Sequence, residues 1–269
     1  MAPDGTRPAR FAGHVYPQVL PEPDDIRAGS DAPWSQLPVS RRTNISLEHV
    51  AARLNDIAAV NQTSIVPGDP SLMAQVGDAE PQEITRRSAV LVALFEEDGE
   101  THLILTRRSS TLREHRGEVA FPGGRSDEGE TPIETALRET HEEVGIAPSA
   151  ITPVSTLSPI VTFAFQSSIF PVVGFLKERP VMVTDPAEVE VAFSVALRDL
   201  LADGAFLEER WHRRESPLRS DADGYFSIYL FQLPHDLLWG ATARVVTELL
   251  CIVTGVEWPE AMGSGPDFA

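Results

Sequence analysis

The chain has 269 residues and a formal net charge of −18, and 42% of its residues are hydrophobic. The acidic balance argues against general nucleic-acid binding, which depends on basic surfaces that neutralise phosphates. The single cysteine, Cys251, excludes an internal disulfide and a zinc site made of several thiolates. No apolar run reaches the roughly 18 residues that predict a membrane span, and the N-terminus lacks a signal-peptide pattern. We therefore expect a cytoplasmic protein with no membrane contact and one domain with extensions.

The first segment, residues 1–45, combines scattered prolines and charges with no sustained period. Such composition predicts an extension that is disordered or draped over the domain. Phe11, Tyr16 and Trp34 are the candidate anchors of this extension.

A packing helix and a linker are predicted over residues 46–83. Apolar residues recur at helical spacing over residues 46–60, and Ser46 is a plausible N-cap. Residues 65–83 are rich in Pro, Gly and Asp and are therefore interpreted as a linker.

A β-hairpin is predicted next. Residues 89–95 form an apolar run of strand length, Asp98 and Gly99 are a turn signal, and residues 102–106 predict the second strand.

Residues 131–144 predict a helix with explicit start and stop signals. Thr131 can act as N-cap, Pro132 suits the first helical position, and Glu134 completes a capping box. Gly145 then ends the helix.

The two faces of this helix differ in chemistry. The face expected to pack on the core holds Ile133, Ala136, Leu137, Thr140 and Val144, and the opposite face holds Arg138, Glu139, Glu142 and Glu143. Repulsion between carboxylates four residues apart costs a helix roughly 0.2–0.5 kcal/mol, and acids in the last turn also oppose the helix dipole. The acids are either a solvated face or the ligands of a compensating cation. Oxygen ligands without His or Cys favour Mg²⁺ or Mn²⁺.

The neighbouring residues favour the cation. Gly124, five residues, Glu130, seven residues and then RETHEEVGI over residues 138–146 resemble the signature of the Nudix hydrolases. Thr140 stands where an aliphatic residue is usual. The resemblance implies hydrolysis of a diphosphate linked to another moiety. It also implies an α/β fold, an α/β/α sandwich around a mixed sheet, over residues 84–258, followed by a tail over residues 259–269.

The same resemblance suggests residue roles. Glu139, Glu142 and Glu143 look like ligands of Mg²⁺ or Mn²⁺, together with the backbone carbonyl of Gly124. Glu130 looks like the partner that orients Arg138. These residues make up the predicted catalytic set: Glu142, Glu139, Arg138 and Glu130. Among the box glutamates, Glu142 is our first choice as the group that takes the proton from water.

Nudix enzymes often add a carboxylate from outside the signature. Glu188 and Glu190 are the two candidates for this role. For each of them, an exposed turn acid is an equally good interpretation.

The segment just before the signature, ILTRRSSTLREHRGEVAFPGG over residues 104–124, is similar to a narrower signature. That signature marks the Nudix subgroup acting on coenzyme A and its thioesters, and Ile104 replaces its first Leu. Coenzyme A carries a 3′-phosphate beside its diphosphate, and the arginine fork binds phosphate oxygens in pairs. The predicted substrate-binding residues are Arg108, Arg113, Arg116 and Arg125. The alternative is that these arginines are solvated residues at a strand edge.

The remainder of the domain is predicted from short patterns. Residues 155–175 resemble strands interrupted by Pro159 and Pro171, and residues 194–201 predict a helix. Residues 225–233 predict another strand. A C-terminal apolar helix from Trp239 to Thr254 is expected to bury Cys251.

The expected reaction is metal-dependent hydrolysis of coenzyme A to 3′,5′-ADP and 4′-phosphopantetheine, or its acyl form. Two alternatives remain open: a Nudix pyrophosphatase acting on ADP-ribose or NADH, and a non-catalytic module that binds a nucleotide. The second alternative is disfavoured because such modules commonly lose signature carboxylates, and all four are present here. The sequence does not indicate the acyl-chain preference or whether the protein is a homodimer.

Overall fold

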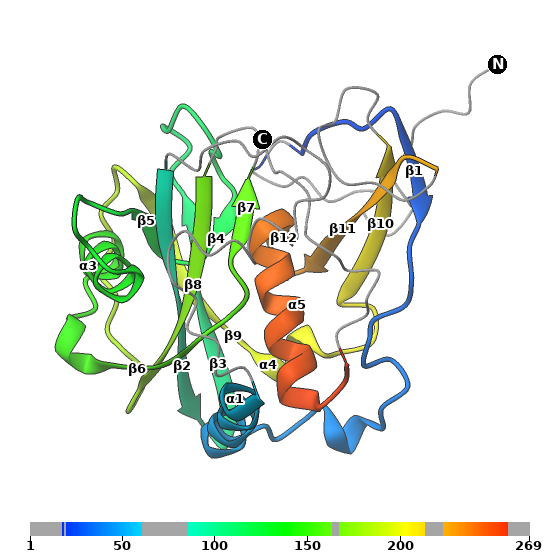
Figure 1. Ribbon diagram of the computed structural model, residues 1–269, viewed down its shortest axis with the longest axis horizontal. Coiled ribbons are helices and arrows are strands. Elements are labelled where there is room, and N and C mark those ends of the chain that lie inside the picture. The colour runs from blue at the N-terminus through cyan, green and yellow to red at the C-terminus, as the bar shows by residue number, and fades with distance from the viewer. Residues whose placement is uncertain (1–17, 19, 61–85, 163–166, 213–222, 258–269) are drawn as a thin grey trace.

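The computed structural model describes residue 18 and residues 20–60, 86–162, 167–212 and 223–257, arranged in two β-sheets with helices around them (Figure 1). The predicted linker at residues 65–83, the tail at 259–269 and two of the candidate anchors, Phe11 and Tyr16, lie outside the described residues. Of the helices within the described ranges, none combines the length and apolar character that crossing a bilayer requires.

The larger sheet is mixed. Its long strands are β2 (Arg86–Glu97), β3 (Glu100–Arg108), β6 (Ile151–Thr156), β8 (Ser167–Leu176) and β9 (Val189–Ala196). Its short strands are β4 (Val119–Ala120), β5 (Gly123–Arg125) and β7 (Ile160–Thr162). The central pair, β2 and β8, is parallel, whereas the other pairs are antiparallel. The predicted hairpin is confirmed, with Asp98 and Gly99 both at positive φ between β2 and β3.

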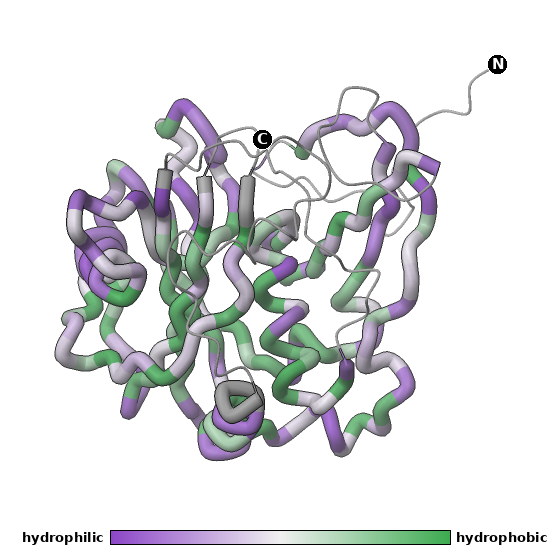
Figure 2. Tube along the Cα trace, in the orientation of Figure 1, coloured by the Kyte–Doolittle hydropathy of each residue, from purple (hydrophilic) through white to green (hydrophobic). Residues whose placement is uncertain are grey.

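Strand β2 shows why both faces of this sheet must be covered. Ala89, Leu91, Ala93 and Phe95 belong to one hydrophobic cluster, and the intervening Val92 and Leu94 belong to another. Because side chains alternate along a strand, the sequence of β2 is apolar on both faces. Hydrophobic residues accordingly follow the strands of the larger sheet and the helix beside it, while the outer face of α3 is hydrophilic (Figure 2).

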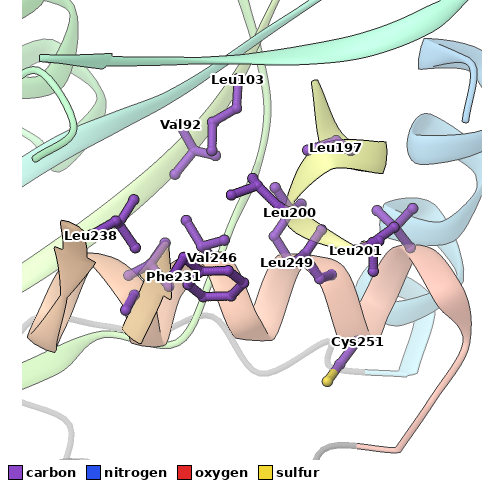
Figure 3. Packing of buried hydrophobic residues seen from close by; sticks show 14 of the residues in the cluster. Val92, Leu103, Leu197, Leu200, Leu201, Phe231, Leu238, Val246, Leu249 and Cys251 are labelled. Carbon is purple, nitrogen blue, oxygen red and sulfur yellow. The ribbon is translucent and has the colours of Figure 1, made fainter. Parts of the chain in front are cut away.

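Helices cover both faces, so the α/β/α sandwich that the resemblance implied is confirmed. Helix α3 (Pro132–Val144) lies on one face, and α1 (Leu47–Val60) and α5 (Gly240–Thr254) lie on the other (Figure 1). Side chains from the larger sheet, α4 (Leu197–Leu200), α5 and the smaller sheet meet in one cluster (Figure 3). Cys251 is buried, as expected.

The smaller sheet is antiparallel throughout and lies beyond α5. Its strands, in spatial order, are β1 (Asp25–Ala28), β10 (Phe206–His212), β11 (Tyr225–Gln232) and β12 (Leu237–Trp239). Residues 20–45 of the N-terminal extension lie against the domain, since they supply the edge strand β1 and the buried Trp34. Two short 3-10 turns, η2 (Val39–Arg41) and η3 (Pro148–Ala150), connect neighbouring elements.

Two sequence-based expectations were wrong. Residues 194–196 are not helical, because they continue β9, which pairs with β3, and α4 begins only at Leu197. Pro171 does not interrupt a strand, because it lies inside β8. On this edge the partner of β8 changes from β7, whose first residue Ile160 pairs with Ile169, to β6, whose last residue Thr156 pairs with Val172. The missing N–H of Pro171 therefore falls between the two ladders.

Candidate active site

The helix that carries the acidic residues begins and ends where the sequence predicted. The Thr131 hydroxyl accepts a hydrogen bond from the Glu134 N–H, and the Glu134 carboxylate accepts one from the Thr131 N–H, so the capping box is complete. Pro132 occupies the first turn. Gly145 caps the C-terminus at φ 73°, and its N–H donates to the His141 carbonyl.

The buried face of α3 differs from the predicted face at its two ends. Ala136, Thr140 and Val144 are buried, and the Thr140 hydroxyl donates to the Ala136 carbonyl at 2.6 Å. Ile133 has the correct helical phase but is 41% exposed, because the structure covers this face only after the first turn. Glu143, which the sequence placed on the acidic face of the helix, is only 3% exposed.

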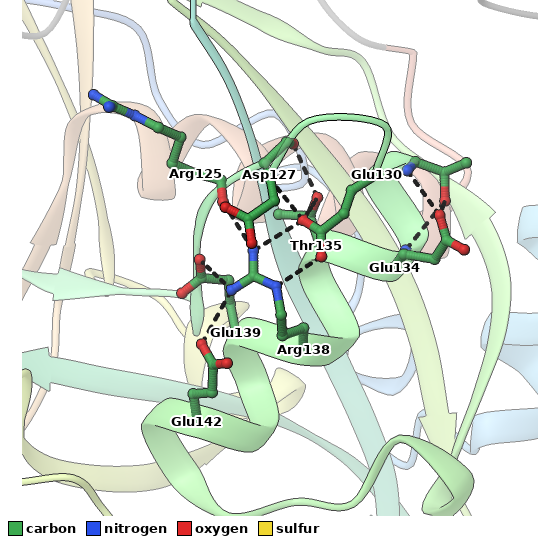
Figure 4. A network of polar contacts seen from close by, with 10 residues as sticks. Arg125, Asp127, Glu130, Glu134, Thr135, Arg138, Glu139 and Glu142 are labelled. Atoms are coloured by element: carbon green, nitrogen blue, oxygen red, sulfur yellow. Dashed lines mark hydrogen bonds and ion pairs between the residues drawn. The ribbon is translucent and has the colours of Figure 1, made fainter.

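Arg138 organises the acidic face of α3 (Figure 4). Its Nε and Nη2 atoms donate to the two oxygens of Glu130 at 2.7 and 2.9 Å, and its Nη1 donates to Glu139 at 2.9 Å and to Glu142 at 3.0 Å. The Arg125 carbonyl accepts a further bond from Nη2. Arg138, followed by the Asp127 N–H, lowers the pKa of Glu130 to about 2. The guanidinium therefore stands between three carboxylates and fixes their spacing.

Glu143 and Glu139 lie against the backbone of β5. The Gly123 N–H donates to Glu143 Oε2 at 3.0 Å. A Cβ added at Gly124 would lie 2.4 Å from Glu139 Cδ, so only glycine leaves room for this carboxylate. Burial raises the pKa of Glu143 to about 7 and also raises the pKa of Glu139. Two partly desolvated carboxylates close to each other are stabilised in their ionised form by a nearby positive charge.

The structure separates the two outside candidates. Glu188 is close enough to raise the pKa of both Glu139 and Glu143 by charge repulsion. We call Glu139, Glu142, Glu143 and Glu188 the carboxylate cluster. Glu190 instead accepts a hydrogen bond from Arg107 Nη1 at 3.1 Å. Sequence patterns could not separate the two candidates, because their positions depend on an irregularity in the pairing of β9 with β3.

The chemistry of this cluster fits a divalent cation. The available donors are all oxygens, which suit Mg²⁺ and Mn²⁺. The positively charged Arg138 guanidinium already forms ion pairs with both Glu139 and Glu142. Among the described residues, however, no three His, Cys, Asp or Glu side chains are close enough together to hold a metal as arranged.

The predicted substrate-binding arginines are placed unequally. Arg108 points toward the cluster, with Nη1 3.9 Å from Glu143 Oε1, and its buried Nε has no hydrogen-bond partner among the described residues. Arg113 and Arg116 are exposed on the loop between β3 and β4, whose base is closed by hydrogen bonds from Arg108 to Glu118 and from Gly117 to Arg108. The Arg125 side chain is exposed and points away from Arg138 (Figure 4).

One residue of the basic segment has another role. Arg107 forms a two-point ion pair with Asp236, which lies in the connection between β11 and β12. The Nε and Nη2 atoms of Arg107 donate to the two oxygens of Asp236 at 2.8 and 3.0 Å. Sequence reasoning missed this pair because the partners are 129 residues apart.

Comparison with known proteins gives consistent matches. The model of the NUDIX domain matches residues 85–218. Nudix hydrolase 3 of Caenorhabditis elegans is 31% identical over 174 residues, which are 61% of this chain and 72% of that protein. Uncharacterized Nudix hydrolase NudL of Cronobacter sakazakii is 36% identical over 166 residues, which are 61% of this chain and 81% of that protein. Nudix hydrolase 15, mitochondrial, of Arabidopsis thaliana is 34% identical over 168 residues, 60% of this chain but only 56% of that protein.

Proposed function

The chain belongs to the Nudix hydrolase family, and from that premise we propose that it hydrolyses the diphosphate bond of coenzyme A or its thioesters. Water adds to one phosphorus atom and the P–O–P bridge breaks, so the products are 3′,5′-ADP and 4′-phosphopantetheine or its acyl form. Nudix hydrolases act on small nucleotide compounds and generally use divalent cations, so membership of this family makes the chain a hydrolase of that class. The choice of coenzyme A is our proposal.

The carboxylate cluster supplies the proposed metal site. Glu139, Glu142 and Glu143 would hold Mg²⁺ or Mn²⁺ with the Gly124 carbonyl, and Glu188 would complete the set. A bound divalent cation would lower the pKa of the attacking water and neutralise the diphosphate. Arg138, held by Glu130, keeps Glu139 and Glu142 at a fixed separation. Glu142, whose side chain is 57% exposed, would take the proton from water.

The observation that carries the substrate proposal is the arrangement of Arg108 and its loop. Arg108 reaches Glu143 from the end of β3, and the loop that carries Arg113 and Arg116 closes back on the Arg108 backbone. Arg108 therefore puts one cation beside Glu143, and Arg113 and Arg116 are exposed on the loop that begins at Arg108, in a protein whose net charge is −18. A substrate with a phosphate beyond its diphosphate gains most from such cations, since arginine binds phosphate oxygens bidentately. Coenzyme A has that phosphate, and ADP-ribose and NADH lack it.

Paired substrates test this proposal. Purified protein with Mg²⁺ is incubated separately with coenzyme A, 3′-dephospho-coenzyme A, an acyl-coenzyme A, ADP-ribose and NADH, and the products are identified by mass. We expect the highest kcat/KM for coenzyme A or its thioester. Replacing Arg113 and Arg116 with Gln should lower kcat/KM for coenzyme A and leave that for the dephosphorylated analogue nearly unchanged. Cleavage of only ADP-ribose or NADH would overturn the choice of substrate and leave the Nudix chemistry standing.

The proton-accepting role has its own test. Glu142→Gln should lower kcat by about 10²–10³, the loss typical when one preorganised charged group is removed. Glu128→Gln, a change of the same size and charge on the exposed loop before α3, is the matched control. A Glu142→Gln enzyme within about threefold of wild type would remove Glu142 from this role. No turnover of any substrate by the wild type would favour the nucleotide-binding module.

A further inference from the structure

Strand β9 contains one extra residue beside the candidate site. Arg107 pairs with Val191, but the next residue of β3, Arg108, pairs with Val189, so Glu190 has no opposite partner in the ladder. Such a β-bulge shifts the register of every residue on its far side, and bulges often lie next to active sites. Glu188 is on that far side, and its carbonyl accepts a hydrogen bond from the Ser109 N–H at 2.8 Å.

The position of the bulge therefore determines where Glu188 lies. If the extra residue moved along β9 or were absorbed into the ladder, Glu188 would shift by one residue, about 3.3 Å, along β3. A shift of that size would carry its carboxylate out of register with Glu139 and Glu143. Something has to hold the extra residue at Glu190.

Three side chains hold it there. Arg107 Nη1 donates to Glu190 Oε1 at 3.1 Å, which ties the unpaired residue to its neighbour on β3. The other side of the same guanidinium is held by both oxygens of Asp236, whose side chain is 7% exposed. Two-point pairing fixes the orientation of a guanidinium as well as its position. Asp236 is itself held in the connection after β11, where its carbonyl accepts from the Leu233 N–H at 2.9 Å.

We propose that Arg107, Asp236 and Glu190 are positioning residues, which lock the β9 bulge and so keep Glu188 in the carboxylate cluster with Glu139 and Glu143. This inference rests on the proposed metal site. It gives the smaller sheet a part in the reaction, since Asp236 lies beyond residues 85–218, the part of the chain that matches the family model. Partners behind the ligands of a metal commonly change its affinity by 10–100-fold.

The proposal can be tested without substrate by measuring the binding of Mn²⁺ alone. The EPR signal of the free ion reports how much Mn²⁺ remains unbound. In Arg107→Met, we expect the dissociation constant for Mn²⁺ to rise about tenfold. The sign is decisive, because removing a nearby positive charge would by electrostatics alone tighten cation binding. Hydrogen exchange at the Ser109 amide should also become faster, since its acceptor is the Glu188 carbonyl. Unchanged or tighter Mn²⁺ binding in Arg107→Met would overturn the proposal.

A second variant separates positioning from folding. Arg107→Met leaves Asp236 buried without its partner, which destabilises proteins, whereas replacing both members of such a pair with apolar residues often restores stability. The double variant Arg107→Met with Asp236→Leu should therefore regain thermal stability and still bind Mn²⁺ weakly. If it regained wild-type affinity together with stability, the network would be merely structural. Arg42→Met, which removes a buried arginine that bonds Leu201 and Asp203, is the matched control and should leave Mn²⁺ affinity unchanged.

Glu188→Gln completes the test. It should weaken Mn²⁺ binding by itself, and adding Arg107→Met to it should have little further effect, because both changes act through one carboxylate. Wild-type protein that bound no Mn²⁺, or a Glu188→Gln variant with unchanged affinity, would remove the basis of the inference. The expected Mn²⁺ pattern in a protein that did not cleave coenzyme A would support the positioning role and reject only the substrate.

Discussion

The burial and the pKa of each residue in the candidate site depend on the groups that other elements place beside it. Burial against β5 raises the pKa of Glu143, and this effect outweighs the Gly123 N–H and Arg108, which both lower it. The sequence placed Glu143 correctly on the acidic side of α3. Its burial was not predictable from helical phase, since it depends on how closely β5 approaches the helix.

The two glycines of β5 should respond differently to the same substitution. A Cβ at Gly124 would meet only the mobile end of Glu139, whereas a Cβ at Gly123 would lie 2.4 Å from the Ala89 carbonyl oxygen, and Gly123 also has φ 155°. We expect Gly124→Ala to fold with nearly wild-type stability but to displace the Glu139 carboxylate and lose most turnover. Gly123→Ala should chiefly lower the free energy of unfolding. Urea unfolding and kcat, measured on both variants, check this contrast, and equal effects on both quantities would contradict it.

Glu130 should contribute a defined part of the pH dependence of stability. Its pKa in the folded protein is about 2, lowered from 4.5 first by Arg138. A group whose pKa is lowered by folding stabilises the protein above its unfolded pKa, and this contribution disappears as the pH falls toward the folded pKa. The difference in unfolding free energy between wild type and Glu130→Gln should therefore be constant above about pH 5.5 and shrink between about pH 4.5 and 2. Urea unfolding of both proteins across this range measures it, and a difference that did not change with pH would rule out the Glu130–Arg138 contribution.

Secondary-structure elements were predictable where their signals are local. The start of α3, its end and the turn between β2 and β3 depend on residues within four positions of one another, and all three were predicted correctly. Residues 194–196 were assigned to a helix because their neighbours suit one. They form the end of β9 because β3 lies alongside and pairs with them. Glu188 and Glu190 could not be separated from the sequence for the same reason, since a bulge is a property of two paired strands.

The N-terminal cap of α3 should have a measurable share in the stability of the protein. Thr131→Ala removes the acceptor for the Glu134 N–H and should cost about 1 kcal/mol, the usual loss for such a cap. Thr131→Ser keeps the hydroxyl and is the control. Chemical unfolding of both variants provides the measurement. A cost for Ala no larger than that for Ser would show that the capping box contributes nothing.

At the scale of the whole molecule, α5 joins two sheets that the sequence did not predict as separate layers. The larger sheet follows from the resemblance to a family, but β10 was not predicted, and β1 lies in a segment interpreted as an extension. Strand β1 has only four residues, and β10, with the sequence FLEERWH, has too many charged residues to be recognised alone. Each is stabilised by pairing over residues far apart in the chain, as Asp25 with His212 and Ala28 with Glu209 illustrate.

Substitution of Trp34 would test whether the N-terminal extension contributes to the hydrophobic core. Its ring lies 5.5 Å from that of Phe206 and 6.2 Å from that of Phe231, centroid to centroid, and the side chain is 1% exposed. Truncating a buried tryptophan to alanine removes its transfer free energy and leaves a cavity, which together cost about 3–5 kcal/mol. We therefore expect Trp34→Ala to lower the unfolding free energy by that amount, and Trp34→Phe, which keeps one aromatic ring, to lower it by much less. Urea unfolding compares the two variants. A loss below about 1 kcal/mol for Trp34→Ala would mean that the extension rests on the surface without contributing to the core.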